Sequence, residues 1–236
     1  MSDKCLLHVA SFFQSFNGEV TALHQGSLCT FIRLSGCNLR CNYCDTKYSQ
    51  EDTPNTSLIS PIELMKEIFT LPHSTARVTI TGGEPLLQRD PLDRLVDFLN
   101  YLDIPVSIET NGTLPIPYSW NVASWVVDCK LPGSGTPREV ACKYYESWVT
   151  GLRKEDFIKF VITNRADFDE AVNIAHNLKR DSCRAGVAFS AASANVFGHT
   201  RLLEWLKEAN LTHAILNVQI HKILFPGSGG GRESEV

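Results

Sequence analysis

The chain has 236 residues, of which 43% are hydrophobic and 20% are charged. This is the composition of a folded globular protein and excludes disorder of the whole chain. Its 22 basic and 26 acidic side chains give a net charge of -4, which provides no broad basic surface, so we expect no direct nucleic-acid partner. The length suits one domain, expected at residues 1–226. The ending PGSGGGRESEV predicts a flexible tail over 227–236.

The first residues, MSDKCLLHVASFF, lack the apolar run and cleavage site of a secretory signal. No window reaches the roughly 18 apolar residues that span a bilayer. We therefore expect a cytoplasmic protein with no membrane partner. In that compartment the eight cysteines are expected to be reduced, so a cluster of them indicates metal ligation before a disulfide framework.

Short apolar runs alternate with helix-like segments along the chain. The runs are SLCTFIRL, ARVTIT, PVSIET, SWVVDC, DFIKFVI, AGVAFS and HAILNVQ. This alternation indicates parallel strands, because a parallel neighbour needs a crossover of a dozen or more residues. The segment GTLPIPYSWN is too short and too rich in proline for a helix, and a full eightfold barrel needs more residues. We expect an α/β fold, a partial (open) parallel β/α barrel of about six strands with a reduced helix set.

Four helices are expected between these strands. Ser60, with Glu63 three residues later, forms a capping box before LMKEIF. A second helix is expected to begin at Asp90 and a third at Asp167, because apolar residues follow each at the 3.6-residue spacing. A fourth is expected over about 201–209.

Three closely spaced cysteines follow the first predicted core strand. Cys37, Cys41 and Cys44 have the spacing C-x3-C-x2-C on an expected loop. Three thiolates leave one iron of a [4Fe-4S] cluster without a protein ligand, and an open iron can bind a substrate or cofactor. One alternative is a zinc site, although structural zinc wants a fourth Cys or His that ordinary spacing does not provide here. Another is a coincidence of buried thiols.

The triplet, with Tyr43 before its last cysteine, resembles the signature of the radical S-adenosylmethionine superfamily. Residues 81–85, TGGEP, resemble the GGE motif of that superfamily and follow the triplet by one strand and one helix. Two glycines let a ligand approach the backbone, and carbonyls together with Glu84 can accept hydrogen bonds from an ammonium group. The resemblance implies a radical enzyme that cleaves S-adenosylmethionine.

Further segments resemble one family of that superfamily, 7-carboxy-7-deazaguanine synthase of the queuosine and 7-deazaguanine pathway. They are FNGE at 16–19, FIR at 31–33, CDTK at 44–47, ETNG at 109–112, DCKLP at 128–132 and QIHK at 219–222. The resemblance implies a homodimer that converts 6-carboxy-5,6,7,8-tetrahydropterin to 7-carboxy-7-deazaguanine with loss of ammonia. A radical made from S-adenosylmethionine would take a hydrogen from the pterin, after electron transfer from a donor such as flavodoxin or ferredoxin.

The resemblance also implies site residues. The pterin contacts would be Phe16, Asn17, Gly18, Glu19, Arg33, Thr81 and His221. The contacts to S-adenosylmethionine would be Gly83, Glu84, Lys130, Ser134 and Ser190. The cluster ligands would be Cys37, Cys41 and Cys44, and Thr46 would bind Mg2+, a hard cation that prefers oxygen ligands.

Residue chemistry supports some of these roles and leaves alternatives. Arg33 suits the 6-carboxylate because a guanidinium binds it bidentately, and Glu19 suits the donor-rich guanidine edge of a pterin. The alternatives are a strand-end salt bridge for Arg33, a surface pair with Lys222 for His221, and a turn hydroxyl for Thr46.

Three positions depart from the family pattern. Asn17 stands where glutamine is usual and is one methylene shorter, so water is expected to mediate its contact. Ser190 lies in AFSAASAN, whose sequence differs from the family turn. Some members end at a proline whose carboxylate meets substrate, whereas residues 227–236 follow Pro226 here. The other cysteines show no tight pair spacing and are expected to be small buried side chains.

Two other functions are weighed against the synthase. A glycyl-radical activating enzyme has the same cysteine spacing but acts on a partner polypeptide, whereas FNGE and QIHK favour a small ligand enclosed by both ends of the chain. A zinc-stabilised binding module would have no catalysis and would contain one zinc in place of about four irons.

Overall fold

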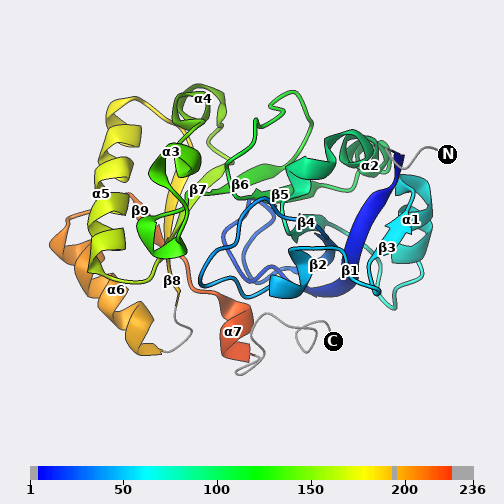
Figure 1. Ribbon diagram of the computed structural model, residues 1–236, viewed down its shortest axis with the longest axis horizontal. Coiled ribbons are helices and arrows are strands. Elements are labelled where there is room, and N and C mark those ends of the chain that lie inside the picture. The colour runs from blue at the N-terminus through cyan, green and yellow to red at the C-terminus, as the bar shows by residue number, and fades with distance from the viewer. Residues whose placement is uncertain (1–4, 193–195, 225–236) are drawn as a thin grey trace.

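The computed structural model describes residues 5–192 and 196–224, which form one mostly parallel sheet with helices beside it (Figure 1). The strand order is β3-β1-β2-β4-β5-β6-β7-β8-β9. The strands are β1 (Leu7–Phe16), β2 (Leu28–Leu34), β3 (Ser57–Ile59), β4 (Val78–Gly82), β5 (Val106–Thr110), β6 (Ser124–Asp128), β7 (Phe157–Ile162), β8 (Gly186–Ala191) and β9 (Ala214–Leu216).

The predicted open parallel barrel is confirmed. Every apolar run named from the sequence contributes a strand. Strand β2 pairs in parallel with β4, and each strand from β4 to β8 pairs in parallel with the next one along the chain. The sheet is larger than the six or so strands expected, because β1 pairs antiparallel with both β2 and β3 at one edge. Within the described residues β3 and β9 stand at opposite ends of the strand order, so the sheet does not close.

Helices and short 3-10 turns connect the strands of the described chain. They are α1 (Pro61–Ile68), α2 (Arg89–Tyr101), α3 (Arg138–Ala141), α4 (Tyr145–Gly151), α5 (Arg165–Arg180), α6 (Val196–Glu208) and α7 (Ile220–Leu224), with short 3-10 turns η2 (Lys47–Ser49), η3 (Pro85–Gln88) and η4 (Pro132–Ser134). The capping box of α1 is confirmed, since Ser60 accepts from the Glu63 N–H and Glu63 accepts from the Ser60 N–H. The crossover from β5 to β6, all of it described, has no helix, as predicted.

The three other predicted helices are confirmed, but each begins earlier in the chain than predicted, α2 by a single residue. Asn164 caps α5 by accepting the N–H of Asp167, so this helix begins before Asp167. The turn η3 leads directly into α2, which begins one residue before Asp90. Helix α6 begins at Val196, ahead of the expected 201–209. For α5 a cap and for α2 a preceding turn set the start, and a pattern of apolar residues alone does not report it.

The core lies between the sheet and these helices. Ile32, Ile80 and Ile108 come from adjacent parallel strands and are fully buried, as are Leu92 of α2 and Phe168 of α5. Helix α5 packs on β7, α6 on β8 and β9, and α2 on β5. Burying such a side chain stabilises the fold by about 1.5–3 kcal/mol, so the core holds the strand ends in fixed positions.

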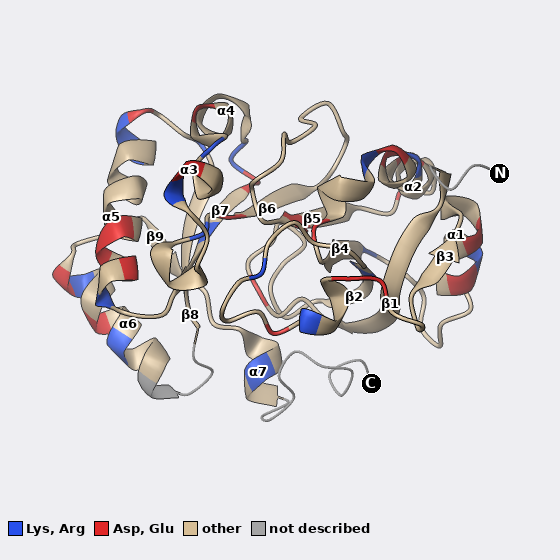
Figure 2. Cartoon of the chain, viewed as in Figure 1, with Lys and Arg blue, Asp and Glu red and all other residues tan. Residues whose placement is uncertain are grey.

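Acidic and basic residues are interspersed along α1, α2 and α5 (Figure 2). No helix in the described part of the chain is long and apolar enough to cross a membrane. Pro226 and the predicted tail 227–236 lie outside the described residues.

Candidate active site

A cavity of about 210 Å³ lies at the carboxyl ends of the parallel strands. Arg33 of β2, Thr81 of β4, Glu109 of β5 and Asp128 of β6 all line it from the last two residues of their strands. Ligands of open α/β sheets bind at this edge, because the connecting loops converge there. We therefore take this cavity as the candidate site.

Most of the site residues expected from the sequence line this cavity. They are Phe16, Gly18, Glu19, Arg33, Cys37, Cys41, Cys44, Thr46, Thr81, Gly83, Lys130 and His221. The two ends of the described chain meet here, because the Ile220 N–H donates to the Gly18 carbonyl at 2.9 Å. This contact brings the FNGE and QIHK segments together.

Four expected site residues lie behind the cavity wall, namely Asn17, Glu84, Ser134 and Ser190. Their side chains form hydrogen bonds within the protein. The Ser134 hydroxyl accepts from the Thr136 N–H at 3.0 Å, and the Ser190 hydroxyl accepts from Asn217 Nδ2 at 2.8 Å. In this structure these four residues support the wall rather than face the space.

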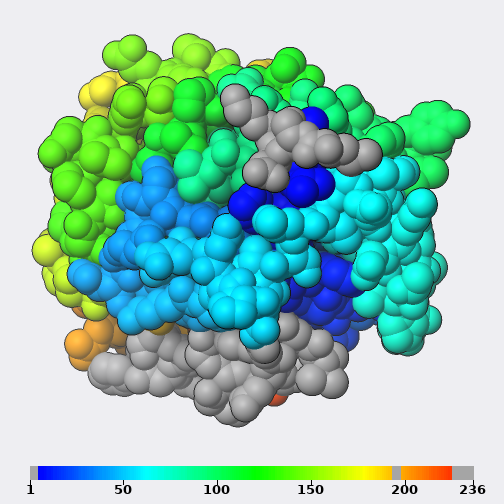
Figure 3. Space-filling view, turned by 45° about the vertical axis from the view of Figure 1, so that its right-hand side comes forward, coloured from blue at the N-terminus to red at the C-terminus, as the bar shows by residue number. Residues whose placement is uncertain are grey.

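The three cysteines lie on the loop between β2 and η2, and none forms a disulfide with a described cysteine. Figure 3 shows the segment that follows β2, in light blue and cyan, at the surface of the molecule. The Cys37 N–H donates to the Gln50 carbonyl at 3.0 Å and fixes the start of the loop. All three cysteines of this loop line the cavity.

The GGE segment packs directly on the cysteine loop. The Glu84 N–H donates to the Gly36 carbonyl at 2.7 Å. A Cβ on Gly83 would overlap the same carbonyl oxygen and would lie 2.8 Å from the Ser49 carbonyl oxygen. Only glycine allows this approach of two backbones, which explains the glycine at this position.

The cysteine residues fit an iron–sulfur cluster by their chemistry. Thiolates are soft ligands that select such clusters. Burial raises the pKa of the Cys37 and Cys41 thiols, so a cationic partner is needed to hold them as thiolates. Among the described residues, no three Cys, His, Asp or Glu side chains converge on one point as ligands of a single ion do. Ligands of a cubane need not converge, because each binds a different iron.

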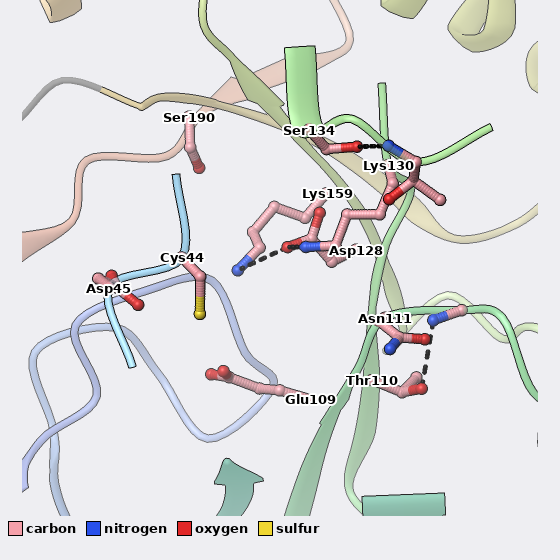
Figure 4. A network of polar contacts seen from close by, with 12 residues as sticks. Cys44, Asp45, Glu109, Thr110, Asn111, Asp128, Lys130, Ser134, Lys159 and Ser190 are labelled. Atoms are coloured by element: carbon pink, nitrogen blue, oxygen red, sulfur yellow. Dashed lines mark hydrogen bonds and ion pairs between the residues drawn. The ribbon is translucent and has the colours of Figure 1, made fainter. Parts of the chain in front are cut away.

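A chain of buried charges crosses the cavity wall. Lys159 Nζ lies 2.5 Å from Glu19 Oε2 and 3.9 Å from Asp128 Oδ2, and Lys130 Nζ lies 2.8 Å from the same Asp128 oxygen. Figure 4 shows Lys159, Asp128 and Glu109 around one space together with Cys44. The order of charges is therefore negative, positive, negative, positive from Glu19 to Lys130.

Two carboxylates in this cavity have opposite proton affinities. Burial favours neutral Glu19, but the nearby ammonium of Lys159 outweighs burial and lowers the pKa to about 2. Burial raises the pKa of Glu109, which accepts a hydrogen bond from Thr81 at 3.0 Å. The site thus combines the ionised carboxylate of Glu19 with the carboxyl group of Glu109, which holds its proton more tightly. In enzymes, two carboxyl groups with different pKa values commonly serve as base and acid.

Unpartnered polar atoms also mark the cavity. Arg33 Nε, Tyr43 Oη and Asp128 Oδ1 are buried without a hydrogen-bond partner among the described residues, and all three residues line the cavity. The Arg33 guanidinium lies 5.8 Å from the centroid of the Phe13 ring. Since buried polar atoms are nearly always paired, these atoms indicate a ligand that brings both donors and acceptors.

Lys159, Asp128 and Glu109 are not among the site residues predicted from the sequence. The last two lie inside segments that were recognised, DCKLP and ETNG. A lysine inside the apolar run DFIKFVI was the available signal for Lys159, because lysine is almost never buried unless it is paired.

Comparison with known proteins identifies the family. A sequence model of the Radical SAM superfamily matches residues 31–119. A 7-carboxy-7-deazaguanine synthase of Clostridium acetobutylicum is 34% identical over 224 residues, covering 92% of this chain and 95% of that protein. Another, of Methanospirillum hungatei, is 33% identical over 225 residues, covering 92% of this chain and 85% of that protein.

The fold agrees with this relationship. The structure of Streptococcus suis SuiB bound to its precursor peptide SuiA superposes with a TM-score of 0.58 at 16% identity, over 76% of this chain and 46% of that one. At this identity the likeness shows the fold alone. The superfamily implies a [4Fe-4S] cluster and S-adenosylmethionine. On the identity and coverage of its relatives, the chain belongs to the 7-carboxy-7-deazaguanine synthase family of radical S-adenosylmethionine enzymes.

Proposed function

We propose that this protein converts 6-carboxy-5,6,7,8-tetrahydropterin to 7-carboxy-7-deazaguanine with loss of ammonia, in the pathway to queuosine and other 7-deazapurines. The reaction needs no net oxidant, because the substrate and the product differ in composition by one molecule of ammonia. The observation that carries the proposal is one cavity wall that combines the three cysteines with Arg33 and Glu19. Membership of the family supports the same substrate.

Cys37, Cys41 and Cys44 would hold the cluster, and the fourth cluster iron would bind S-adenosylmethionine. Bound there, the cluster would supply the electron that cleaves S-adenosylmethionine and so starts the radical reaction of the pterin. Gly83 and Lys130 line the cavity beside the cysteine loop, which supports contacts with S-adenosylmethionine. From behind the wall, Glu84, Ser134 and Ser190 would shape that part of the site.

The pterin would lie between Arg33 and Glu19. A guanidinium with an unpartnered Nε suits the 6-carboxylate, because the two groups bind in a bidentate manner. The ionised Glu19 suits the donors of the guanidine edge. Phe16, Gly18, Thr81 and His221 line the same cavity, and Asn17 would act through water or by holding the FNGE loop.

A divalent cation would bind beside Thr46. The Thr46 hydroxyl lies 3.8 Å from Cys44 Sγ and lines the cavity. Mg2+ prefers oxygen ligands and retains several waters, so the substrate carboxylate and water would complete its shell. The neighbouring Asp45 is paired with Lys222 at 3.4 Å.

The proposal includes partners and organisation. We propose a homodimer of cytoplasmic chains, reduced by an electron donor such as flavodoxin or ferredoxin, with residues 1–226 as a single domain and 227–236 as a tail. Size-exclusion chromatography with light scattering measures the oligomeric state, and a monomer at working concentrations would contradict that part.

The test of the activity is an anaerobic assay of the reconstituted protein with the carboxypterin, S-adenosylmethionine, Mg2+ and dithionite. We expect 7-carboxy-7-deazaguanine by mass spectrometry. Formation of 5'-deoxyadenosine without this product would remove the synthase assignment and leave the superfamily assignment in place.

A further inference from the structure

Lys159 is a buried cation in the middle of a parallel strand. Its side chain is 7% exposed and reaches from β7 into the cavity wall. The ammonium lies 2.5 Å from Glu19, a residue of the loop after β1, and 3.9 Å from Asp128 at the end of β6. Lysine is rarely buried without a specific partner, so the position of Lys159 calls for an explanation.

Glu19 is held from three directions. Lys159 donates to Oε2, Asn217 Nδ2 donates to the same oxygen at 3.2 Å, and Gln219 Nε2 donates to Oε1 at 2.7 Å. Asn217 is itself fixed, since its Oδ1 accepts the Val20 N–H at 3.0 Å. An ionised carboxylate accepts about four hydrogen bonds, so these three donors fix its orientation and leave about one acceptor site for a ligand in the cavity that Glu19 lines.

Titratable groups from several elements line the cavity together with this carboxylate. They are Lys159 of β7, Asp128 of β6, Glu109 of β5, Arg33 of β2 and His221 of α7. Burial lowers the pKa of His221, so this ring is neutral at physiological pH. Asn217 and Gln219 carry no charge. Among the residues that the structure describes, Lys159 is therefore the cation in direct contact with Glu19, and a buried carboxylate without such a partner takes up a proton.

We propose that Lys159 is a positioning residue of the pterin site, which keeps the Glu19 carboxylate ionised and in one orientation for the guanidine edge of the substrate. This inference rests on the proposed function. In this role Lys159 acts through Glu19, the carboxylate that it contacts directly. Its charge offsets the cost of burying Glu19, and its ammonium donates to Glu19 Oε2.

The direct test is the affinity of the reconstituted enzyme for 6-carboxypterin, the oxidised analogue, from about pH 6 to about pH 9. The wild type and Lys159→Arg should bind with a nearly flat pH profile, because Glu19 stays ionised. Lys159→Met should bind at least about tenfold more weakly near neutral pH. Its affinity should rise with pH, because the burial of Glu19 without a cation raises the pKa into this range. Equal affinity and a flat profile in Lys159→Met would overturn the proposal.

A double-mutant cycle separates positioning from general damage. If Lys159 acts through the charge of Glu19, adding Lys159→Met to Glu19→Gln costs little further affinity. Losses that simply add would contradict the proposal. Should Lys159→Met alone fail to fold, Glu19→Gln and the double variant still decide, because replacing both members of a buried ion pair by neutral groups is commonly tolerated.

Lys154→Met is the matched control. The Lys154 side chain is 84% exposed and pairs only loosely with Glu155, at 3.6 Å, so pterin affinity and its pH profile should match the wild type. If the pterin affinity of Lys154→Met also rose with pH, the pH dependence of Lys159→Met would not report on the ionisation of Glu19.

Failure of the proposed function would be seen separately. A wild type that binds no carboxypterin and makes no deazaguanine removes the proposed function. The Glu19–Lys159 pair is then tested by unfolding of the cluster-free protein. The stability gap between wild type and Lys159→Met should narrow as the pH falls from neutral toward about 4.5, because the variant's raised Glu19 pKa makes its folded state gain protons there. A gap independent of pH would overturn the ionisation argument.

Discussion

Glu84 accepts a hydrogen bond from the Asn111 N–H at 2.7 Å, which ties the segment after β4 to the segment after β5. The same carboxylate accepts from Thr110 Oγ1 at 2.8 Å and from the Leu86 N–H at 3.0 Å. Glu84 is fully buried. Its oxygens thus face the protein in this structure, and a direct contact with an ammonium group stays a prediction.

Glu84→Gln is expected to lower the free energy of unfolding by about 3 kcal/mol. The new amide turns an NH2 group toward N–H and O–H donors, and unsatisfied buried donors are costly. Urea unfolding of the cluster-free protein measures the change. The exposed Glu67→Gln on α1 should stay within about 0.5 kcal/mol. Equal midpoints for the two variants would show that the Glu84 hydrogen bonds contribute nothing.

Cys41→Ala is expected to abolish formation of the cluster and cleavage of S-adenosylmethionine, because two thiolates do not hold a cubane with one open iron. Iron analysis after anaerobic reconstitution should fall from about four irons per chain to a small fraction of that value. Cys183→Ala is the control, because Cys183 lies away from the cysteine loop and its thiol contacts the Trp148 carbonyl at 3.8 Å. Retained cleavage in Cys41→Ala would refute the ligand assignment.

Gly83→Ala tests the contact between the GGE segment and the cysteine loop. A Cβ there overlaps the Gly36 carbonyl oxygen, and backbone atoms cannot move aside cheaply, so we expect a loss above about 3 kcal/mol. Gly26→Ala is the comparison: Gly26 has φ +84, with no described atom within 4 Å of the new Cβ. It should lose only about 1 kcal/mol from backbone strain. Similar losses in the two variants would disprove the close packing.

Arg33→Lys is expected to weaken binding of 6-carboxypterin about tenfold, because an ammonium replaces bidentate contact by a point charge. The affinity for pterin without the carboxylate should change little, since that ligand lacks the group that Arg33 recognises. Fluorescence titration of the reconstituted enzyme compares the two ligands. A matching loss for both would mean that Arg33 does not read the carboxylate.

Local sequence patterns predicted much of the fold. The parallel strands, the capping box at Ser60 and the loop position of the cysteines all depend on residues that are close in the chain. Strands β1 and β3 were missed. Strand β3 pairs antiparallel with β1, and the paired residues are far apart in the chain, for example His8 and Leu58. The sequence around each strand does not indicate which distant strand it pairs with.

The sequence by itself determined the family and predicted the candidate site residues, because the cysteine spacing, the GGE motif and the family segments are properties of neighbours along the chain. Only the tertiary structure decided that Glu84 faces the protein and that Lys159 meets Glu19, 140 residues away. The physical reason is that burial and charge pairing depend on which strands become adjacent, and both the orientation and the proton affinity of a side chain follow from that environment.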